Sequence, residues 1–286
     1  MASPEPSRYI WIDGGVAERA AFDPARNRAF RYGDGLIETV RLSRGELLFF
    51  HDHMDRMFAG LQALMLPVEA GWDARFFYER IGRLLTANGV TSSARIRIQV
   101  WRTGEGLYAP SHQGADFLIE TTEATDQYEF NDAGFSAGVS QNVRKTYDRL
   151  ANVKTSSALT YVMAALEAKE KNKDLLFVLN ERGVVADAPG RNVFILEKGN
   201  VITPPLTDAG VAGVFRFQLL ELLRSHNIVT REESIDAKRL AEAEEIFVTN
   251  VMDGIQPVTM FEAKAKPAVQ SKELYRLFRN HLLHVE

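Results

Sequence analysis

The segment from which the fold and function of this chain are most readily inferred is residues 150–161, Leu-Ala-Asn-Val-Lys-Thr-Ser-Ser-Ala-Leu-Thr-Tyr. Unlike most lysines of the chain, Lys154 does not sit among other charges, and it precedes a predicted helix with Thr155, Ser156 and Ser157 as capping candidates. A helix N-terminus disfavours a nearby cation, and partial burial lowers the pKa of a lysine. We therefore predict an uncharged ε-amine, the form that attacks carbonyl compounds. The alternative is a lysine that extends its ammonium group into water.

The composition is that of a globular protein. The chain has 286 residues, of which 45% are hydrophobic and 25% charged, and these proportions are ordinary for a globular chain. The absence of cysteine excludes disulfides, thiolate metal sites and a cysteine nucleophile. No apolar run approaches the roughly 20 residues that span a bilayer, and the N-terminus lacks the pattern of a secretory signal. We therefore expect a cytoplasmic protein with no metal site and no membrane association.

The charge pattern argues against nucleic acid as a partner. The chain has 34 basic and 38 acidic residues, which give a net charge of -4. Nucleic-acid-binding domains usually carry a basic stripe, whereas the lysines between residues 169 and 173 alternate with acidic residues. That alternation is typical of a solvated helix end. The sequence therefore predicts a small-molecule partner.

Strands and helices follow one another without regular alternation. The predicted strands cover residues 9–13, 38–42, 46–50, 95–100, 134–140, 174–180, 192–197, 245–249 and 255–258. The predicted helices cover residues 51–65, 73–87, 156–171, 214–226 and 271–284. Because a helix does not follow every strand, an α+β fold fits better than a doubly wound sheet. The polar segment 121–132 predicts a loop between an N-terminal domain, residues 1–120, and a C-terminal domain, residues 133–286.

Six segments in a characteristic order point to one family. They are residues 30–41 (FRYGDGLIETVR), 51–56 (HDHMDR), the segment around Lys154, 185–194 (VADAPGRNVF), 203–216 (TPPLTDAGVAGVFR) and 245–258 (EIFVTNVMDGIQPV). Together they resemble the fold-type IV enzymes that use pyridoxal 5'-phosphate (PLP). These are the class IV aminotransferases, which include branched-chain and D-amino acid aminotransferases and aminodeoxychorismate lyases. The resemblance implies a two-domain, D-amino acid aminotransferase-like fold, with a smaller N-terminal α/β domain and a larger, strand-rich, PLP-binding C-terminal domain.

The resemblance implies roles toward the cofactor. Lys154 would carry PLP as a Schiff base and then act as the base that moves the substrate proton. Asp187 would keep a proton on the pyridine nitrogen, which makes the ring an electron sink. The phosphate would bind at a helix N-terminus, where free N–H groups face an anion. The resemblance also implies that Arg56, in the helix predicted from residue 51, contacts the phosphate. It implies further cofactor contacts from Gly213, Val214 and Phe215, in a turn that also contains Gly210, and from Asn250 in the late loop.

The resemblance also implies substrate-binding residues, namely Tyr32, Glu38, Arg97, Arg102, Val251 and Met252. Arg97 and Arg102 are five residues apart, so they point to opposite faces of an unbroken strand and at most one meets a substrate carboxylate. The alternative for either is an exposed strand arginine. Since the family is built of dimers with shared active sites, we expect a homodimer in which Tyr32 packs on the substrate.

Two departures from the family pattern concern the cofactor, and a third concerns the substrate. Asp187 stands where most members have glutamate, so the ring or the backbone must shift by about 1–1.5 Å to keep the contact. Phe215 replaces a frequent threonine, which removes a hydroxyl bond to the phosphate but keeps the backbone N–H. Branched-chain aminotransferases have a tyrosine five residues after the lysine; this chain has Leu159 there, and Tyr161 lies two residues further on.

The activity that the resemblance implies is a PLP-dependent aminotransferase for a small amino acid, with a keto acid as acceptor. The alternative is an aminodeoxychorismate lyase, whose Arg-x-Gly-x-Gly-x-Tyr spacing is similar to residues 102–108. A lesser alternative is a non-catalytic PLP-binding homologue, which the departures at Asp187 and Phe215 motivate.

Overall fold

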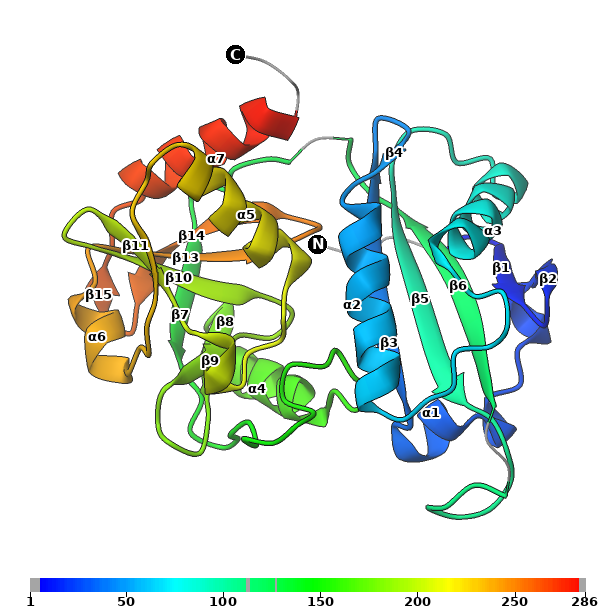
Figure 1. The fold of residues 1–286 in the computed structure, drawn as a ribbon. Coiled ribbons are helices and arrows are strands. Elements are labelled where there is room, and N and C mark those ends of the chain that lie inside the picture. The colour runs from blue at the N-terminus through cyan, green and yellow to red at the C-terminus, as the bar shows by residue number, and fades with distance from the viewer. Residues whose placement is uncertain (1–5, 112–113, 127, 283–286) are drawn as a thin grey trace. The chain divides into compact units, whose positions relative to one another are not determined.

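The computed structural model describes residues 6–111, 114–126 and 128–282 (Figure 1). The chain forms two compact units: unit 1 comprises Met1–Gln127 and Val153–Ala158, and unit 2 comprises Tyr128–Asn152 and Leu159–Glu286. The chain first leaves unit 1 inside the polar segment predicted as a loop between domains. Val153–Ala158, which the sequence places in the C-terminal domain, joins unit 1. The first five residues and His284, the end of the last predicted helix, lie outside the described residues.

Unit 1 is built on a six-stranded antiparallel sheet, in the order β2-β1-β6-β5-β3-β4. Its strands are β1 (Tyr9–Ile12), β2 (Gly15–Glu18), β3 (Gly35–Ser43), β4 (Glu46–Leu47), β5 (Ala94–Arg102) and β6 (Ala115–Glu123). Its helices are η1 (Arg19–Ala21), η2 (Pro24–Arg26), α1 (Arg28–Tyr32), α2 (Phe50–Ala63) and α3 (Ala74–Ala87).

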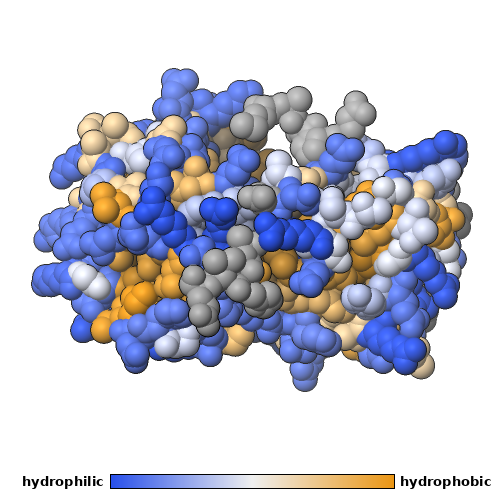
Figure 2. All heavy atoms as spheres, turned by 90° about the horizontal axis from the view of Figure 1, so that it is seen from above, coloured by the Kyte–Doolittle hydropathy of each residue, from blue (hydrophilic) through white to orange (hydrophobic). Residues whose placement is uncertain are grey.

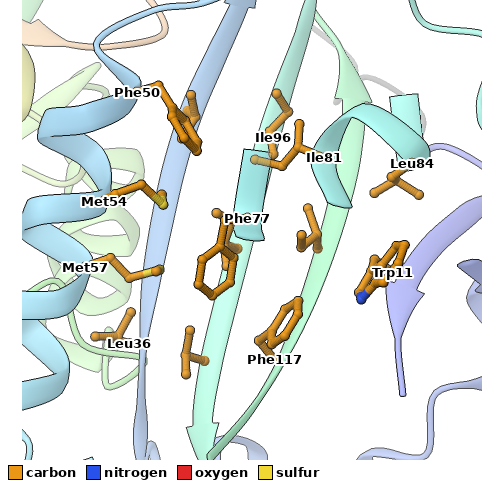
Figure 3. Close-up of a cluster of buried hydrophobic side chains, with 14 of the residues drawn as sticks. Trp11, Leu36, Phe50, Met54, Met57, Phe77, Ile81, Leu84, Ile96 and Phe117 are labelled. Carbon is orange, nitrogen blue, oxygen red and sulfur yellow. The ribbon is translucent and has the colours of Figure 1, made fainter. Parts of the chain in front are cut away.

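The core of unit 1 lies between this sheet and the helices α2 and α3. Figure 3 shows side chains of both helices, among them Met54, Met57 and Phe77, directed toward the strands. Because strand side chains alternate between faces, the even-numbered residues of β5 from Ala94 to Val100 are all buried there. β3 supplies Leu36 from the adjacent strand to the same core.

Local signals explain where α2 and α3 begin. The Asp73 side chain accepts a hydrogen bond of 2.7 Å from the Phe76 N–H, which caps α3 at the predicted residue. The strand predicted over residues 46–50 is wrong beyond Leu47. Phe49 adopts a left-handed conformation with φ of 53°, and α2 begins at Phe50. A run of apolar residues alone does not distinguish a strand from a helix start.

Unit 2 contains a nine-stranded mixed sheet in the order β12-β11-β10-β13-β14-β7-β8-β9, with β15 paired to β14. The pairs β11–β12, β14–β7 and β7–β8 are parallel. The strands are β7 (Phe135–Val139), β8 (Leu175–Leu179), β9 (Val185–Asp187), β10 (Asn192–Glu197), β11 (Asn200–Thr203), β12 (Thr230–Glu232), β13 (Glu245–Asn250), β14 (Gly254–Phe261) and β15 (Lys264–Ala265). The helices are α4 (Leu159–Glu170), η3 (Leu206–Asp208), α5 (Val214–Ser225), α6 (Ala237–Glu242) and α7 (Val269–Leu282). The α+β class predicted from the sequence is confirmed.

The surface is mostly hydrophilic, with separate hydrophobic patches on the face drawn in Figure 2. Among the described helices, none is long and apolar enough to cross a membrane. The described residues also contain no group of three or more His, Cys, Asp or Glu side chains that could hold a metal ion.

Candidate active site

In unit 1, the backbone around Lys154 is held by β3. The Lys154 carbonyl accepts a hydrogen bond of 2.9 Å from the Ile37 N–H, and the Ser156 N–H donates to the Gly35 carbonyl at 2.8 Å. A β-bridge joins Leu36 and Thr155 between these bonds. The helix α4 begins at Leu159 and not at Ser156, so the predicted capping beside Lys154 is wrong. The backbone of residues 154–156 therefore pairs with β3 as an added strand would, and its hydrogen bonds occupy backbone groups of β3 at Gly35 and Ile37.

The pKa of the Lys154 side chain is nevertheless shifted in the predicted direction. Burial lowers its pKa to about 8, the Glu38 carboxylate opposes this shift, and three arginines lower the pKa further, Arg56, Arg95 and Arg97. Burial removes water from the ammonium form, and neighbouring positive charges also disfavour that form. The cause is therefore burial among cations and not a helix dipole. A substantial fraction of uncharged amine is present at mildly alkaline pH.

Glu38 forms the centre of a buried ionic cluster under α2. It lies on the core-facing side of β3 and is 1% exposed. It accepts hydrogen bonds of 2.9 Å from Arg56 Nε and 2.7 Å from the Thr39 N–H, and it pairs with the other side of the Arg56 guanidinium. His53 Nδ1 lies 2.9 Å from its Oε1. Burial raises the pKa of Glu38, but Arg56 and His53 outweigh this effect and hold it well below the usual range.

This cluster affects two of the predicted site residues. Glu38 is ionised, and both of its carboxylate oxygens accept hydrogen bonds from Arg56 in a bidentate ion pair. The sequence did not point to His53, although its position three residues before Arg56 on a helix placed both on one face. Phosphate binding by Arg56 and substrate binding by Glu38 stay predictions.

The two arginines of β5 differ in what they contact. Arg97 is partly exposed and donates to Glu120 at 3.2 Å. Arg102 donates to the carbonyls of Leu64 and Met65 at 2.7 and 2.8 Å, and its Nε lies 3.2 Å from Asp34. Since β5 is unbroken from Ala94 to Arg102, the two side chains point to opposite faces of the strand. Arg102 thus anchors the end of α2, and Arg97 has the greater freedom to meet a carboxylate.

Tyr32, the last residue of α1, packs against a loop that follows β5. Its ring lies 5.9 Å from the ring of Tyr108. The buried Arg28 guanidinium lies 5.0 Å from the Tyr32 ring centre and donates to the Leu107 carbonyl at 2.8 Å. The sequence did not point to Arg28, which ties Tyr32 to this loop. Contact between Tyr32 and a substrate stays a prediction.

In unit 2, Asp187 ends β9 and is 2% exposed. Its Oδ2 accepts hydrogen bonds of 2.7 Å from the Tyr161 hydroxyl and 3.0 Å from the Val211 N–H, and Lys145 Nζ lies at 3.5 Å. Its Oδ1 is buried and has no hydrogen-bond partner among the described residues. Burial raises the pKa of Asp187, while Lys145, Val211 and Tyr161 act in the opposite direction. One carboxylate oxygen is therefore saturated, and the other is open to a ligand.

The start of α5 presents a second open site in unit 2. Gly213 is the N-cap and has no side chain to cap the helix. Val214, Phe215 and Arg216 are buried, and their N–H groups make no hydrogen bond within the part of the chain that the structure describes. Buried, unpaired N–H groups at a helix N-terminus form a binding site for an anion. A Cβ atom at Gly213 would lie 1.8 Å from Asn192 Oδ1, so the close packing requires glycine.

Packing explains the phenylalanine at position 215. Its ring lies 4.3 Å from the Phe278 ring and 5.9 Å from the Tyr128 ring, and the side chain is 2% exposed. The side chain therefore belongs to the core of unit 2, where an aromatic ring contributes buried area. Only its backbone N–H is available at the helix start.

The late loop, between β13 and β14, is shaped by Asn250. The Asn250 side-chain oxygen accepts hydrogen bonds of 2.8 Å from the Met252 N–H and 2.7 Å from the Asp253 N–H. The Val251 carbonyl accepts one of 2.7 Å from the Tyr128 hydroxyl. Asn250 thus forms an Asx turn that orders the loop. The cofactor and substrate contacts expected of this loop stay predictions.

Sequence reasoning missed Lys145 and Val211 and assigned no role to Tyr161. No local pattern marks Lys145, because its partners Tyr161 and Asp187 are 16 and 42 residues away in the sequence. The tyrosine two residues beyond the position used by branched-chain aminotransferases was the available signal. In this chain the Tyr161 hydroxyl donates a hydrogen bond to the Asp187 carboxylate.

Comparison with known proteins identifies the family. Residues 35–261 match the sequence model of the family described as amino-transferase class IV. An aminodeoxychorismate lyase of Vibrio harveyi is 28% identical over 257 residues, covering 89% of this chain and 92% of the relative. A branched-chain-amino-acid aminotransferase of Escherichia coli K12 is 24% identical over 269 residues, covering 87% and 84%.

Solved structures share the fold. A branched-chain aminotransferase from Thermoproteus uzoniensis, crystallised with norvaline, has a TM-score of 0.89 at 23% identity, covering 98% of this chain and 96% of the other. An aminotransferase from Brucella abortus bound to PLP has a TM-score of 0.83 at 22% identity, covering 96% and 98%. Since the family match extends over most of the length, this chain belongs to the class IV aminotransferases.

Proposed function

We propose that this chain is a PLP-dependent aminotransferase that takes the amino group of a small amino acid and passes it to a keto acid. The observation that carries the proposal is the partly buried amine of Lys154, whose backbone is held by β3 and whose pKa is lowered to about 8. A mostly charged lysine does not attack an aldehyde, whereas a lysine with this pKa is partly free at neutral pH. Family membership supplies the reaction class, and this side chain supplies the nucleophile.

The residues present fit PLP. Among the described residues, the buried Oδ1 of Asp187 and the N–H groups of Val214 and Phe215 have no hydrogen-bond partner, so Oδ1 suits a protonated ring nitrogen and the N–H groups suit the phosphate. A cationic contact from Arg56 to the cofactor stays a prediction of the family resemblance. When bound, PLP would supply an electron sink for the bonds of the substrate α-carbon. Lys154 would hold the cofactor and, once released by the substrate amine, move the proton from the α-carbon.

Borohydride reduction tests the proposal. Protein supplied with PLP and reduced should carry one covalent pyridoxyl group, and peptide mass mapping should place it on Lys154. Lys154→Ala should abolish the label, whereas Lys169→Ala, at an exposed lysine of α4, should leave it unchanged. A label on Lys145, whose side chain in unit 2 is 11% exposed, would contradict the assignment.

A second candidate function is an eliminating lyase on the same cofactor. The Vibrio harveyi relative, named aminodeoxychorismate lyase, and the spacing of residues 102–108 favour it. A half-reaction distinguishes the two: an amino donor without acceptor should convert bound PLP to pyridoxamine 5'-phosphate in an aminotransferase and leave PLP unchanged in a lyase. A protein that binds PLP but is silent with D- and L-amino acids and aminodeoxychorismate would be the non-catalytic homologue.

We also propose that the chain assembles as a homodimer. Four large apolar residues at helical spacing on α4 are exposed by 41–70%, namely Leu159, Val162, Met163 and Leu166. An exposed apolar stripe of this kind is typical of a surface that another chain covers. Light scattering should give twice the 32.1 kDa chain mass, and Val162→Glu combined with Leu166→Glu should give the monomer. A cytoplasmic location stays a prediction, to be tested by cell fractionation.

A further inference from the structure

Asp187 is held by residues that sequence motifs do not mark. The Tyr161 hydroxyl, from the first turn of α4, donates to Asp187 Oδ2 at 2.7 Å. Lys145 Nζ donates to the same hydroxyl at 2.7 Å and to the Ala151 carbonyl at 2.9 Å, and lies 3.5 Å from Asp187 Oδ2. The Lys145 side chain is 11% exposed and that of Asp187 is 3% exposed. The two residues and the carboxylate form a buried, connected network.

The network acts on one side of the carboxylate only. Tyr161, Lys145 and the Val211 N–H all meet Oδ2, whereas Oδ1 is buried without a partner among the described residues. An ionised carboxylate in a buried place is costly unless charge and hydrogen bonds compensate it. Tyr161 and Lys145 supply that compensation at Oδ2. They leave Oδ1 as the oxygen that can accept a proton-bearing ligand.

We propose that Lys145 and Tyr161 are positioning residues, which keep Asp187 ionised and oriented with Oδ1 toward the ring nitrogen of the cofactor. This inference rests on the proposed function. Tyr161 and the backbone N–H of Val211 also fix the direction of the short aspartate side chain. The lysine contributes charge, and the tyrosine links that charge to the carboxylate.

The sign of the pH effect follows from the groups that face Asp187. Burial raises its pKa, and Lys145, the Val211 N–H and Tyr161 lower it. Loss of Lys145 must therefore raise the pKa further. A protonated Asp187 cannot pair with a protonated ring nitrogen, so cofactor affinity should fall as the pH falls through this pKa. In Lys145→Met the fall should occur at higher pH.

The test measures the affinity of the cofactor-free protein for pyridoxamine 5'-phosphate between pH 5 and 9. This probe has the ring nitrogen and the phosphate but no aldehyde, so it does not react with Lys154. Lys145→Met should shift the midpoint of the pH dependence upward by about one unit, which lowers the affinity by up to about tenfold on the acid side of the midpoint. Tyr161→Phe should act in the same direction by about threefold to tenfold. Lys145→Arg, which keeps the charge, should restore most of the affinity.

Asp187→Asn provides the matched background, because it removes the ionisation on which the network acts. There, the further change Lys145→Met should alter affinity by less than twofold. An unmoved midpoint in both variants, or an equal loss in the Asp187→Asn background, would overturn the inference and leave Lys145 and Tyr161 as packing residues. If the unmodified protein labels on Lys154 but the midpoints coincide, only this inference fails. If it binds neither form of the cofactor, the proposed function fails with it.

Discussion

Replacement of Lys154 by methionine should make the cofactor-free protein more stable at neutral pH. Burial lowers the pKa of this lysine from 10.5 to about 8, and each pKa unit corresponds to about 1.36 kcal/mol. At pH 7 the folded protein therefore bears a cost of about 3 kcal/mol for its charged amine. Methionine has a similar length and no charge, so the variant should recover most of this free energy.

The pH dependence gives the sharper test. The folded pKa lies below the unfolded one, so between pH 8 and 10.5 the unfolded chain binds more protons and stability rises with pH. Between pH 7 and 9.5 the contribution of Lys154 should improve by about 2 kcal/mol. The advantage of Lys154→Met over the unmodified protein should shrink by the same amount, because other groups titrate equally in both.

Urea unfolding followed by tryptophan fluorescence is a suitable assay. All three tryptophans, Trp11, Trp72 and Trp101, belong to unit 1, as does Lys154, so the signal reports the relevant unit. Lys169→Met, at an exposed position, is the control and should follow the unmodified protein. If Lys154→Met and the unmodified protein change in parallel from pH 7 to 9.5, the lysine is not buried as described and the reasoning is refuted.

Three other substitutions test separate parts of the structure. Gly213→Ala places a Cβ 1.8 Å from Asn192 Oδ1, so fluorescence titration should show PLP affinity about tenfold weaker; an unchanged affinity would contradict a phosphate site there. Glu38→Gln removes the carboxylate that pairs with Arg56 and should lower the free energy of unfolding by about 3 kcal/mol in urea, whereas less than about 1 kcal/mol would mean the pair is not buried. Arg102→Met loses bonds to two carbonyls and Asp34 and should cost about 2 kcal/mol in stability; a higher KM for the substrate without such a loss would instead identify a substrate ligand.

The parts of the fold that could be predicted have local causes. Asp73 caps α3 through a side chain three residues from its donor, and the alternation in β5 marks its buried face. α5 begins at Val214 as predicted, directly after its N-cap Gly213. Each of these features depends on residues close in the sequence, so propensity and periodicity are sufficient.

The remaining features depend on contacts between distant residues. Lys154 was expected beside a helix start, but its backbone bonds to β3, more than a hundred residues earlier. The partners of Asp187 come from a loop, a helix and a second loop. Pairing at such separations is decided by the whole fold. The family resemblance named Asp187 but not Lys145, which lies outside the six segments, and it gave no role to Tyr161, which lies in the segment around Lys154.

Membership of Val153–Ala158 in unit 1 has a consequence for how the molecule is made. During synthesis, β3 emerges long before the segment that covers its edge at Gly35 and Ile37. Unit 1 therefore cannot complete its folding until the ribosome has added residue 158. By that time β7, the first strand of unit 2, has already been synthesised. A fragment ending at residue 127 would leave that edge bare, and aggregation during expression is the expected outcome. Adding the missing peptide in trans should rescue its solubility.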